Sequence, residues 1–303
     1  MFLNGIILVN KIEGISSAGV VKAVKNLLGC KVGHGGTLDP LATGVLPILV
    51  GEGTKFGAFS LNESKTYHAE ILLGVSTNTG DREGNITETN NVTCSTVGIK
   101  NVLTEFVGGY TQTVPSFSAV KVRGVPLYKR ARKGLPVEKV KRKVEIKEIK
   151  LLSLNIPTFI IEVSCSKGTY IRSLAEDIGA RLGCGAHITN LKRTSVGEFT
   201  ITESFSLSEI AHNYKLYGPK IIKEKYIRPI ELFLKDFASF HLVNTEVARI
   251  IDGVAITIPP DYKNSLSNKV IKLYDEKKNF IGLGEVRENK IFPKRLINTE
   301  TIR

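Results

Sequence analysis

The clearest pattern in the chain is the alternation of apolar and polar residues over positions 65–74, which predicts a strand with one buried face. The uninterrupted apolar run at 45–50 predicts a strand that is buried on both faces. Further strands are expected at residues 5–10, 146–154 and 159–164. The last two of these strands are expected to pair with each other across a short turn.

Helical spacing of apolar residues appears in three other segments. Ser16 or Ser17 is the expected N-cap of the first helix, and Gly29 its expected end. Thr169 is able to cap the third helix, and Gly183 is its natural stop. The three expected helices are residues 20–28, 97–106 and 170–182.

After residue 235 the pattern changes to short strand-like pieces separated by turns. This predicts a small β-barrel appended to a mixed α/β domain, hence two domains, 1–235 and 236–303. Residues 205–235 carry little pattern and are expected to hold the linker, and the polar segment 76–85 is expected to be a loop. The strand-like pieces are residues 240–242, 254–258, 270–274 and 280–286.

Composition points to a polyanionic partner. The 303 residues include 42 Lys and Arg against 29 Asp and Glu, a net charge of +13. The cysteines at positions 30, 94, 165 and 184 are widely spaced, which favours reduced thiols in the cytoplasm over a zinc or redox motif. No apolar run approaches the roughly 18 residues of a membrane span. Neither a membrane anchor nor a cleaved leader is therefore expected.

One carboxylate, Asp39, lies in the glycine-rich segment GHGGTLDP at residues 33–40, close to His34. An acid on a loop beside a rigid buried strand is a common mounting for a catalytic group. Asp-Pro is equally an ordinary turn dipeptide. A nucleotide-binding loop is disfavoured because neither glycine motif for phosphate is present. A metal site is disfavoured because no second His or Cys lies nearby at ligand spacing.

Two further segments carry candidate partners for Asp39. Tyr67, which follows Lys65 in the alternating strand, is either a half-buried strand residue or a ring for stacking on a base. Arg172 is expected in the first turn of a helix, where the helix dipole disfavours a cation. Its position suggests a fixed anionic partner, a phosphate or Asp39 itself, and the alternative is a solvated arginine.

Residues 112–137 contain six cations with interleaved aromatic rings and no acidic residue. A local excess of positive charge beside aromatic rings is typical of RNA-binding surfaces, and the alternative is a solvated charged face. We refer to the six cations as the basic patch. They are Lys121, Arg123, Lys129, Arg130, Arg132 and Lys133.

Five motifs follow one another along the chain: GHGGTLDPLATGVLP, KTY, FSAVKVRGVPLY, GTYIRSLAEDIG and AHITNLKRTSVG. Together they resemble the motifs of the bacterial tRNA pseudouridine-55 synthases, which convert a uridine in the TΨC loop of tRNA to pseudouridine. The resemblance implies an α+β catalytic domain, with a mixed, mainly antiparallel sheet and flanking helices, followed by a PUA-like RNA-binding β-barrel. Ile12 and Val114 stand where the family commonly has proline.

The resemblance assigns roles to the matching positions. Asp39 matches the essential aspartate, Tyr67 the tyrosine packed against the target base, and Arg172 the arginine paired with the aspartate. Further matching positions surround the uridine, and among them the histidine helps to push the nucleotide out of its loop. They are His34, Lys65, Tyr170 and Leu191. The resemblance also implies a monomer that acts on the TΨC stem-loop of tRNA and needs no metal or other cofactor.

The reaction implied by the resemblance breaks the N1–C1′ bond, turns the uracil and joins C5 to C1′. The base must first be flipped out of its stack. Asp39 would act as nucleophile or electrostatic stabiliser, with Arg172 favouring its ionised form. Attack at C1′, attack at C6 and removal of a ribose proton all remain open. The competing class is a non-catalytic RNA-binding or tRNA-folding protein, whereas an ordinary glycosidase would need two carboxylates.

Overall fold

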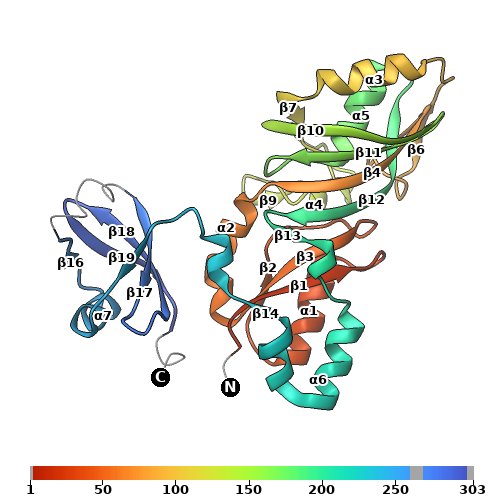
Figure 1. Cartoon of the computed structure of the whole chain (residues 1–303). Helices are drawn as coiled ribbons and strands as arrows, with labels where there is room; N and C mark the ends of the chain where they lie inside the picture. The colour runs from red at the N-terminus through yellow and green to blue at the C-terminus, as the bar shows by residue number, and fades with distance from the viewer. Residues whose placement is uncertain (1–2, 260–268, 299–303) are drawn as a thin grey trace.

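The computed structural model describes residues 3–259 and 269–298 (Figure 1), so the ends of both expected domains and the segment 260–268 lie outside the described part. One sheet of ten strands and one of five account for most of the strands. The large sheet contains β1 (Gly5–Lys11), β2 (Val32–His34), β3 (Thr43–Val50), β4 (Lys65–Leu73), β7 (Gly108–Thr113), β10 (Lys141–Asn155), β11 (Thr158–Cys165), β12 (Ala186–Val196), β13 (Phe199–Thr200) and β14 (Ile227–Arg228). The small sheet contains β15 (Ser239–His241), β16 (Ile256–Thr257), β17 (Val270–Tyr274), β18 (Phe280–Arg287) and β19 (Lys290–Leu296). Two separate hairpins pair β5 (Val75–Thr77) with β6 (Ile86–Thr89), and β8 (Lys121–Val122) with β9 (Val125–Pro126).

Helices connect and cover the sheets. The α-helices of the described residues are α1 (Ser17–Leu28), α2 (Gly57–Asn62), α3 (Thr96–Glu105), α4 (Leu127–Ala131), α5 (Ile171–Arg181), α6 (Leu207–Ile221) and α7 (Asn244–Ile251). Shorter turns are the 3-10 helices η1 (Gly51–Phe56), η2 (Ile201–Glu203) and η4 (Ile230–Phe233), and the π-helix η3 (Ile222–Tyr226).

The large sheet runs in the order β14-β1-β3-β12-β4-β11-β10-β7, with β2 added to β3 and β13 to β12. Every neighbouring pair is antiparallel except β3 with β12, which is parallel. The expected mixed, mainly antiparallel sheet is therefore confirmed. Because β12 inserts between β3 and β4, it brings the loop that precedes β3 next to the strand that carries Tyr67.

Strands β1 and β3 are buried on both faces because helices cover one face and the C-terminal lobe covers the other. Successive residues of a strand point to opposite faces. Accordingly Ile7 and Ile48 belong to the cluster that includes residues of α1 and α6, while Ile6 and Leu49 belong to a second cluster with Phe280 of the C-terminal sheet. The prediction that 45–50 is buried on both faces is confirmed, as is the single buried face of β4.

The C-terminal sheet has the strand order β15-β17-β18-β19-β16 and its own apolar core. It forms a curled half-barrel, in agreement with the expected PUA-like domain. Figure 1 shows it as a separate lobe beside α2. Aromatic contact joins the two parts, since the rings of Phe56 and Phe280 have centroids 5.6 Å apart.

Two sequence expectations are wrong. Residues 205–235 are not a loose linker, because they form α6, η3 and η4 and place Ile210 and Tyr226 in the main core. Gly218, at φ 70°, and Pro219 interrupt α6 near its end, and a Gly-Pro pair normally predicts a turn. Thr169 does not cap α5, because its hydroxyl donates to the Ser166 carbonyl (2.9 Å). The first helix does begin as expected, with Ser16 as N-cap.

Gly44 is expected to tolerate no side chain. It lies at φ +104°, and a Cβ there would come 2.1 Å from the Arg193 carbonyl oxygen at the β3–β12 contact. Gly108 has the same φ with nothing within 4 Å, so it is a matched control. Gly108→Ala should cost about 1–3 kcal/mol of unfolding free energy from backbone strain. Gly44→Ala should cost a further ~1–3 kcal/mol from overpacking. Urea unfolding of both variants measures the difference, and equal losses would contradict the expectation.

Candidate active site

The segment 35–42, here called the Asp39 loop, has no regular secondary structure, but most of its carbonyls are hydrogen-bonded. Each carbonyl oxygen from residue 35 to residue 40 accepts a hydrogen bond. The donors are Ser60 Oγ to Gly35 (2.8 Å), Arg193 Nη2 to Gly36 (3.1 Å), Arg193 Nη1 to Thr37 (3.3 Å), Ser17 Oγ to Leu38 (2.9 Å), the Ala42 amide to Asp39 (3.1 Å) and Lys11 Nζ to Pro40 (3.1 Å). The loop is therefore held as firmly as a strand.

Asp39 and Arg172 form an ion pair with unequal exposure. Arg172 Nε lies 2.9 Å from Asp39 Oδ2, and the side chains are 4% and 35% exposed, respectively. The guanidinium does not hold the carboxylate with two nitrogens, because Nη1 donates to the Thr79 carbonyl (3.0 Å) and Nη2 to the Phe117 carbonyl (3.0 Å). The arginine is thus fixed from behind, and the carboxylate remains accessible in front.

Asp81 is a second carboxylate beside Arg172 that the sequence did not reveal. It is 4% exposed, and its Oδ2 lies 3.7 Å from Arg172 Nε. Its other oxygen accepts from Thr79 Oγ1 (2.6 Å) and from the Glu83 amide (3.1 Å). An aspartate in a polar segment looks like an ordinary turn residue, so only its burial marks it.

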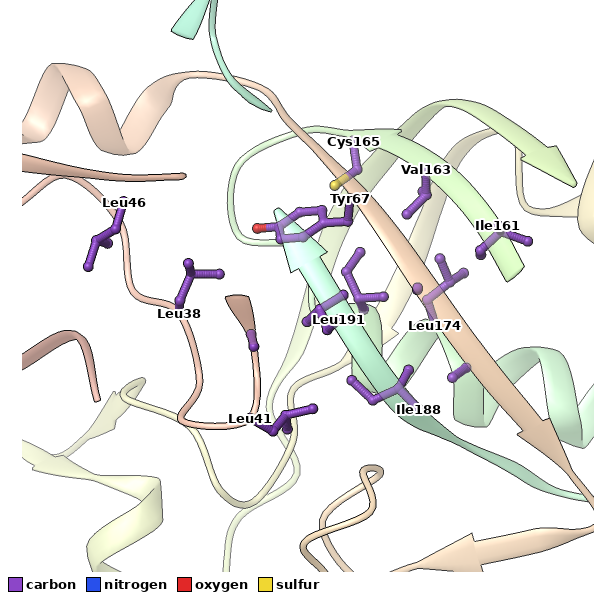
Figure 2. Close-up of a cluster of buried hydrophobic side chains, with 14 of the residues drawn as sticks. Leu38, Leu41, Leu46, Tyr67, Ile161, Val163, Cys165, Leu174, Ile188 and Leu191 are labelled. Atoms are coloured by element: carbon purple, nitrogen blue, oxygen red, sulfur yellow. The ribbon is translucent and has the colours of Figure 1, made fainter. Parts of the chain in front are cut away.

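Tyr67 and Leu191 lie in the apolar cluster next to the Asp39 loop. Figure 2 shows the Tyr67 ring near Cys165 and Leu191, with its hydroxyl directed toward the segment that carries Leu38. Tyr67 is the cross-strand neighbour of Arg193. Burial raises the pKa of Tyr67 and Arg193 opposes that rise, so the hydroxyl is protonated at neutral pH.

His34 and Tyr170 flank the site, and both are half-buried. Burial, assisted by Arg193, lowers the pKa of His34, so its ring is neutral near pH 7. Its Nδ1 accepts from the Gly36 amide (3.4 Å). The Tyr170 backbone is held by the buried Gln112, which accepts from its amide (2.8 Å) and donates to its carbonyl (2.9 Å). Gln112 was not among the candidates from sequence.

Lys65 lies in a different setting from the one the resemblance implies. Its side chain is buried, and its Nζ donates to the carbonyls of Ser60 (3.3 Å), Leu61 (3.0 Å) and Glu63 (2.5 Å). An ammonium has three donors, and these carbonyls use all of them. Burial lowers the pKa of Lys65 to about 8. It closes the end of α2 and has no donor left for a uridine.

The basic patch occupies the β8–β9 hairpin, α4 and the residues next to them. All six cations are exposed, and in the described part of the chain none has a carboxylate oxygen within 4.0 Å. Arg132 lies over the Tyr128 ring, 5.4 Å from its centroid. The same segment begins at the site, since the Phe117 carbonyl accepts from Arg172. The patch is thus a free positive surface connected to the ion pair.

A cavity of about 190 Å³ lies between α5 and the segments 78–79 and 113–116. Glu176 and Asp177 line it, and burial raises the pKa of Glu176 to about 7 and that of Asp177 to about 6. Residues 3–259 and 269–298, the cavity included, contain no cluster of three or more His, Cys, Asp or Glu that could hold a metal. No helix among them is long and apolar enough to cross a membrane.

Glu176 is expected to make stability fall as pH rises. Its pKa is raised from 4.5 to about 7, so between these values the folded state binds more protons than the unfolded state. Glu176 therefore begins to lower the free energy of unfolding above pH 4.5, and this loss reaches its full size above pH 7. Glu176→Gln should be more stable relative to the parent at pH 8 than at pH 4. Urea unfolding at both pH values measures this, with Glu138→Gln, at an exposed position of the same cavity, as control. A pH-independent difference would contradict it.

Models of pseudouridine synthase domains match nearly the whole chain. "TruB family pseudouridylate synthase (N terminal domain)" matches residues 23–171, and "tRNA pseudouridylate synthase B C-terminal domain" matches 172–235. "Pseudouridine synthase II TruB, C-terminal" matches residues 238–297. These matches define the class of the protein as a pseudouridine synthase.

Individual relatives narrow the class to one family. The chain is 37% identical over 300 residues to the tRNA pseudouridine synthase B of Azoarcus sp. (strain BH72), covering 99% of this chain and 96% of the relative. It is 39% identical over 296 residues to that of Clostridium kluyveri, covering 97% and 99%. The chain belongs to the TruB family of pseudouridine synthases. The family is the one that the five motifs predicted, and its members are enzymes.

The fold is shared with a solved structure. A chain in the crystal structure of a Cbf5-Nop10-Gar1 complex superposes with a TM-score of 0.72 and is 25% identical. The match covers 97% of this chain and 85% of that chain, so both the large sheet and the C-terminal lobe are common to the two proteins.

Proposed function

We propose that the protein isomerises uridine-55 in the TΨC loop of tRNA to pseudouridine, with Asp39 as the catalytic carboxylate. The observation that carries the proposal is the ion pair in which Asp39 faces outward and Arg172 is buried behind it (2.9 Å). Asp39 lies on an immobilised loop next to the apolar cluster that contains Tyr67. Arg172 contacts the segment of the basic patch through the Phe117 carbonyl. The two relatives compared above, which align along nearly their full length, carry the name tRNA pseudouridine synthase B, and this supports tRNA as the substrate.

The steps follow from the positions of these groups. Cations of the basic patch bind RNA phosphates and offset the cost of flipping the uridine, a few kcal/mol. The flipped base packs against Tyr67 and Leu191 at the edge of the apolar cluster, while His34 and Tyr170 border the entry. Asp39 then acts at C1′ as nucleophile or as electrostatic stabiliser.

The proton balance limits what Tyr67 can do. The N1–C1′ bond breaks, the uracil turns, C5 bonds to C1′, the C5 proton leaves, and N1 gains a proton. Tyr67 is a candidate for removing the C5 proton. Its protonated hydroxyl accepts a proton poorly, so this role requires Arg193 to stabilise the phenolate.

The two lobes divide the work in this proposal. Residues 1–235 form the catalytic domain, and residues 236–303 form an RNA-binding domain of the PUA type. The separate apolar core of the C-terminal sheet supports this division. The proposed active form is a monomer.

Turnover by the parent enzyme is the direct test. An unmodified tRNA transcript is incubated with the protein, and pseudouridine is mapped at single-nucleotide resolution. Pseudouridine at position 55 is expected. Its absence from a folded, RNA-binding protein would reject the activity, and its appearance at another uridine would reject the proposed position.

Asp39→Asn should bind tRNA as tightly as the parent but form no measurable pseudouridine. The amide keeps the shape of the side chain and loses the charge that a nucleophile or stabiliser needs. Filter binding gives the affinity and the mapping assay gives turnover. Asp252→Asn, at the C-cap of α7, serves as the control and should leave both unchanged. Pseudouridine formation by Asp39→Asn at the parental rate would remove Asp39 from the chemistry.

Replacing Lys129 and Arg132 together by Ala should weaken tRNA binding and flatten its salt dependence. Each lost phosphate contact should reduce the slope of log K against log salt by roughly 0.7–0.9. The matched control removes two exposed lysines of α6, Lys215 and Lys220. Filter binding between 50 and 300 mM salt measures both slopes. A parental slope in the Lys129/Arg132 variant would mean that these two cations make no phosphate contact.

A further inference from the structure

Arg193 is a fully buried cation at the junction of the Asp39 loop, β3 and β4. It is 1% exposed and heads the fully buried side chains by size. Burying a guanidinium costs several kcal/mol unless an anion accompanies it. Among the described residues no carboxylate oxygen lies within 4.0 Å of its nitrogens. A buried guanidinium without an ion-pair partner is costly. Packing alone does not account for an arginine at this position.

The donors of Arg193 reach three structural parts at once. Nε donates to the Val45 carbonyl of β3 (2.8 Å), and the two terminal nitrogens donate to the Gly36 and Thr37 carbonyls of the Asp39 loop (3.1 and 3.3 Å). Tyr67 on β4 is the cross-strand neighbour of Arg193, and the guanidinium opposes the rise in the pKa of its hydroxyl. One planar group therefore joins the strand after the loop, the loop itself and the proposed base-packing ring.

The backbone of Arg193 lies at the same junction. In the sheet register its partner on β3 is Gly44 and its partner on β4 is Tyr67. A lysine at this position would keep the charge, but its single nitrogen could not satisfy acceptors arranged around a planar fork. The geometry of the guanidinium, and not its charge alone, matches the acceptors.

We infer that Arg193 is a positioning residue for the reaction, which sets the placement of the Asp39 carboxylate relative to the Tyr67 ring. The inference rests on the roles proposed above for Asp39 and Tyr67. Arg193 donates to the Gly36 and Thr37 carbonyls of the loop that carries Asp39, and its cross-strand neighbour on β4 is Tyr67. Displacement of the loop by even 1 Å is enough to cost about 10²-fold in rate.

The test compares Arg193→Lys, which keeps the charge, and Arg193→Met, which keeps the bulk, with Lys192→Met as control. Lys192 is the adjacent residue of β12 and is exposed. Rate constants are measured in single turnover with saturating enzyme, because these do not depend on the fraction of folded protein. Affinity for tRNA is measured by filter binding, and folding by thermal melting.

Arg193→Lys should fold and bind tRNA within about threefold of the parent. Its single-turnover rate constant should fall by about 10²-fold, because a displaced loop weakens interactions made in the transition state more than binding. Arg193→Met should lose at least as much, and Lys192→Met should keep the parental rate constant. A parental rate constant in Arg193→Lys overturns the inference. So does failure of that variant to fold, since it would assign Arg193 to stability. Absence of turnover in the parent would instead reject the proposed function.

Discussion

The structure depends on the immobilisation of an irregular loop by groups buried beneath it. A segment without helix or strand has no ladder to satisfy its carbonyls, and unsatisfied buried carbonyls are costly. Here two serines, a lysine and an arginine supply most of the donors for residues 35–40. Loss of the Ser17 or Ser60 hydroxyl would leave a buried carbonyl without its donor. The loop is therefore rigid because of side chains from α1, α2, β1 and β12, and not because of its own sequence.

Strand order explains how such distant donors reach one loop. β12 comes late in the chain and inserts between β3 and β4 as the parallel neighbour of β3. The insertion places Arg193 against residues more than 140 positions earlier in the chain. Helix α5, which precedes β12, places Arg172 next to Asp39 of the same loop. The interdomain cluster around Phe56 and Phe280 buries the second face of β3 and completes the support.

Much of the architecture could be predicted because alternation and helical spacing act locally. The strands around 5–10, 45–50 and 65–74 follow from those patterns, whereas the helix at 207–221 was not predicted, and it contains the helix-breaking pair Gly218-Pro219. The residues of the candidate site were predicted from the motif resemblance and not from these patterns. Asp81, Gln112 and Arg193 were not found, because a lone polar residue in a strand or loop looks solvated until the fold shows that it is buried.

The unequal exposure of Asp39 and Arg172 determines what their ion pair is for. A pair with one partner 35% exposed gains little stability from Coulomb attraction in water, while its buried arginine carries a desolvation cost. The pair therefore presents a fixed negative charge more than it stabilises the fold. An RNA backbone approaching that charge is repelled by it, and repulsion grows as water is excluded. In the proposed complex, the basic patch would supply the opposite charge along the path of the phosphates, and its segment contacts Arg172 through the Phe117 carbonyl. Attraction at the patch would then offset repulsion at Asp39, and the same exclusion of water would strengthen the field of the carboxylate on the bound nucleotide.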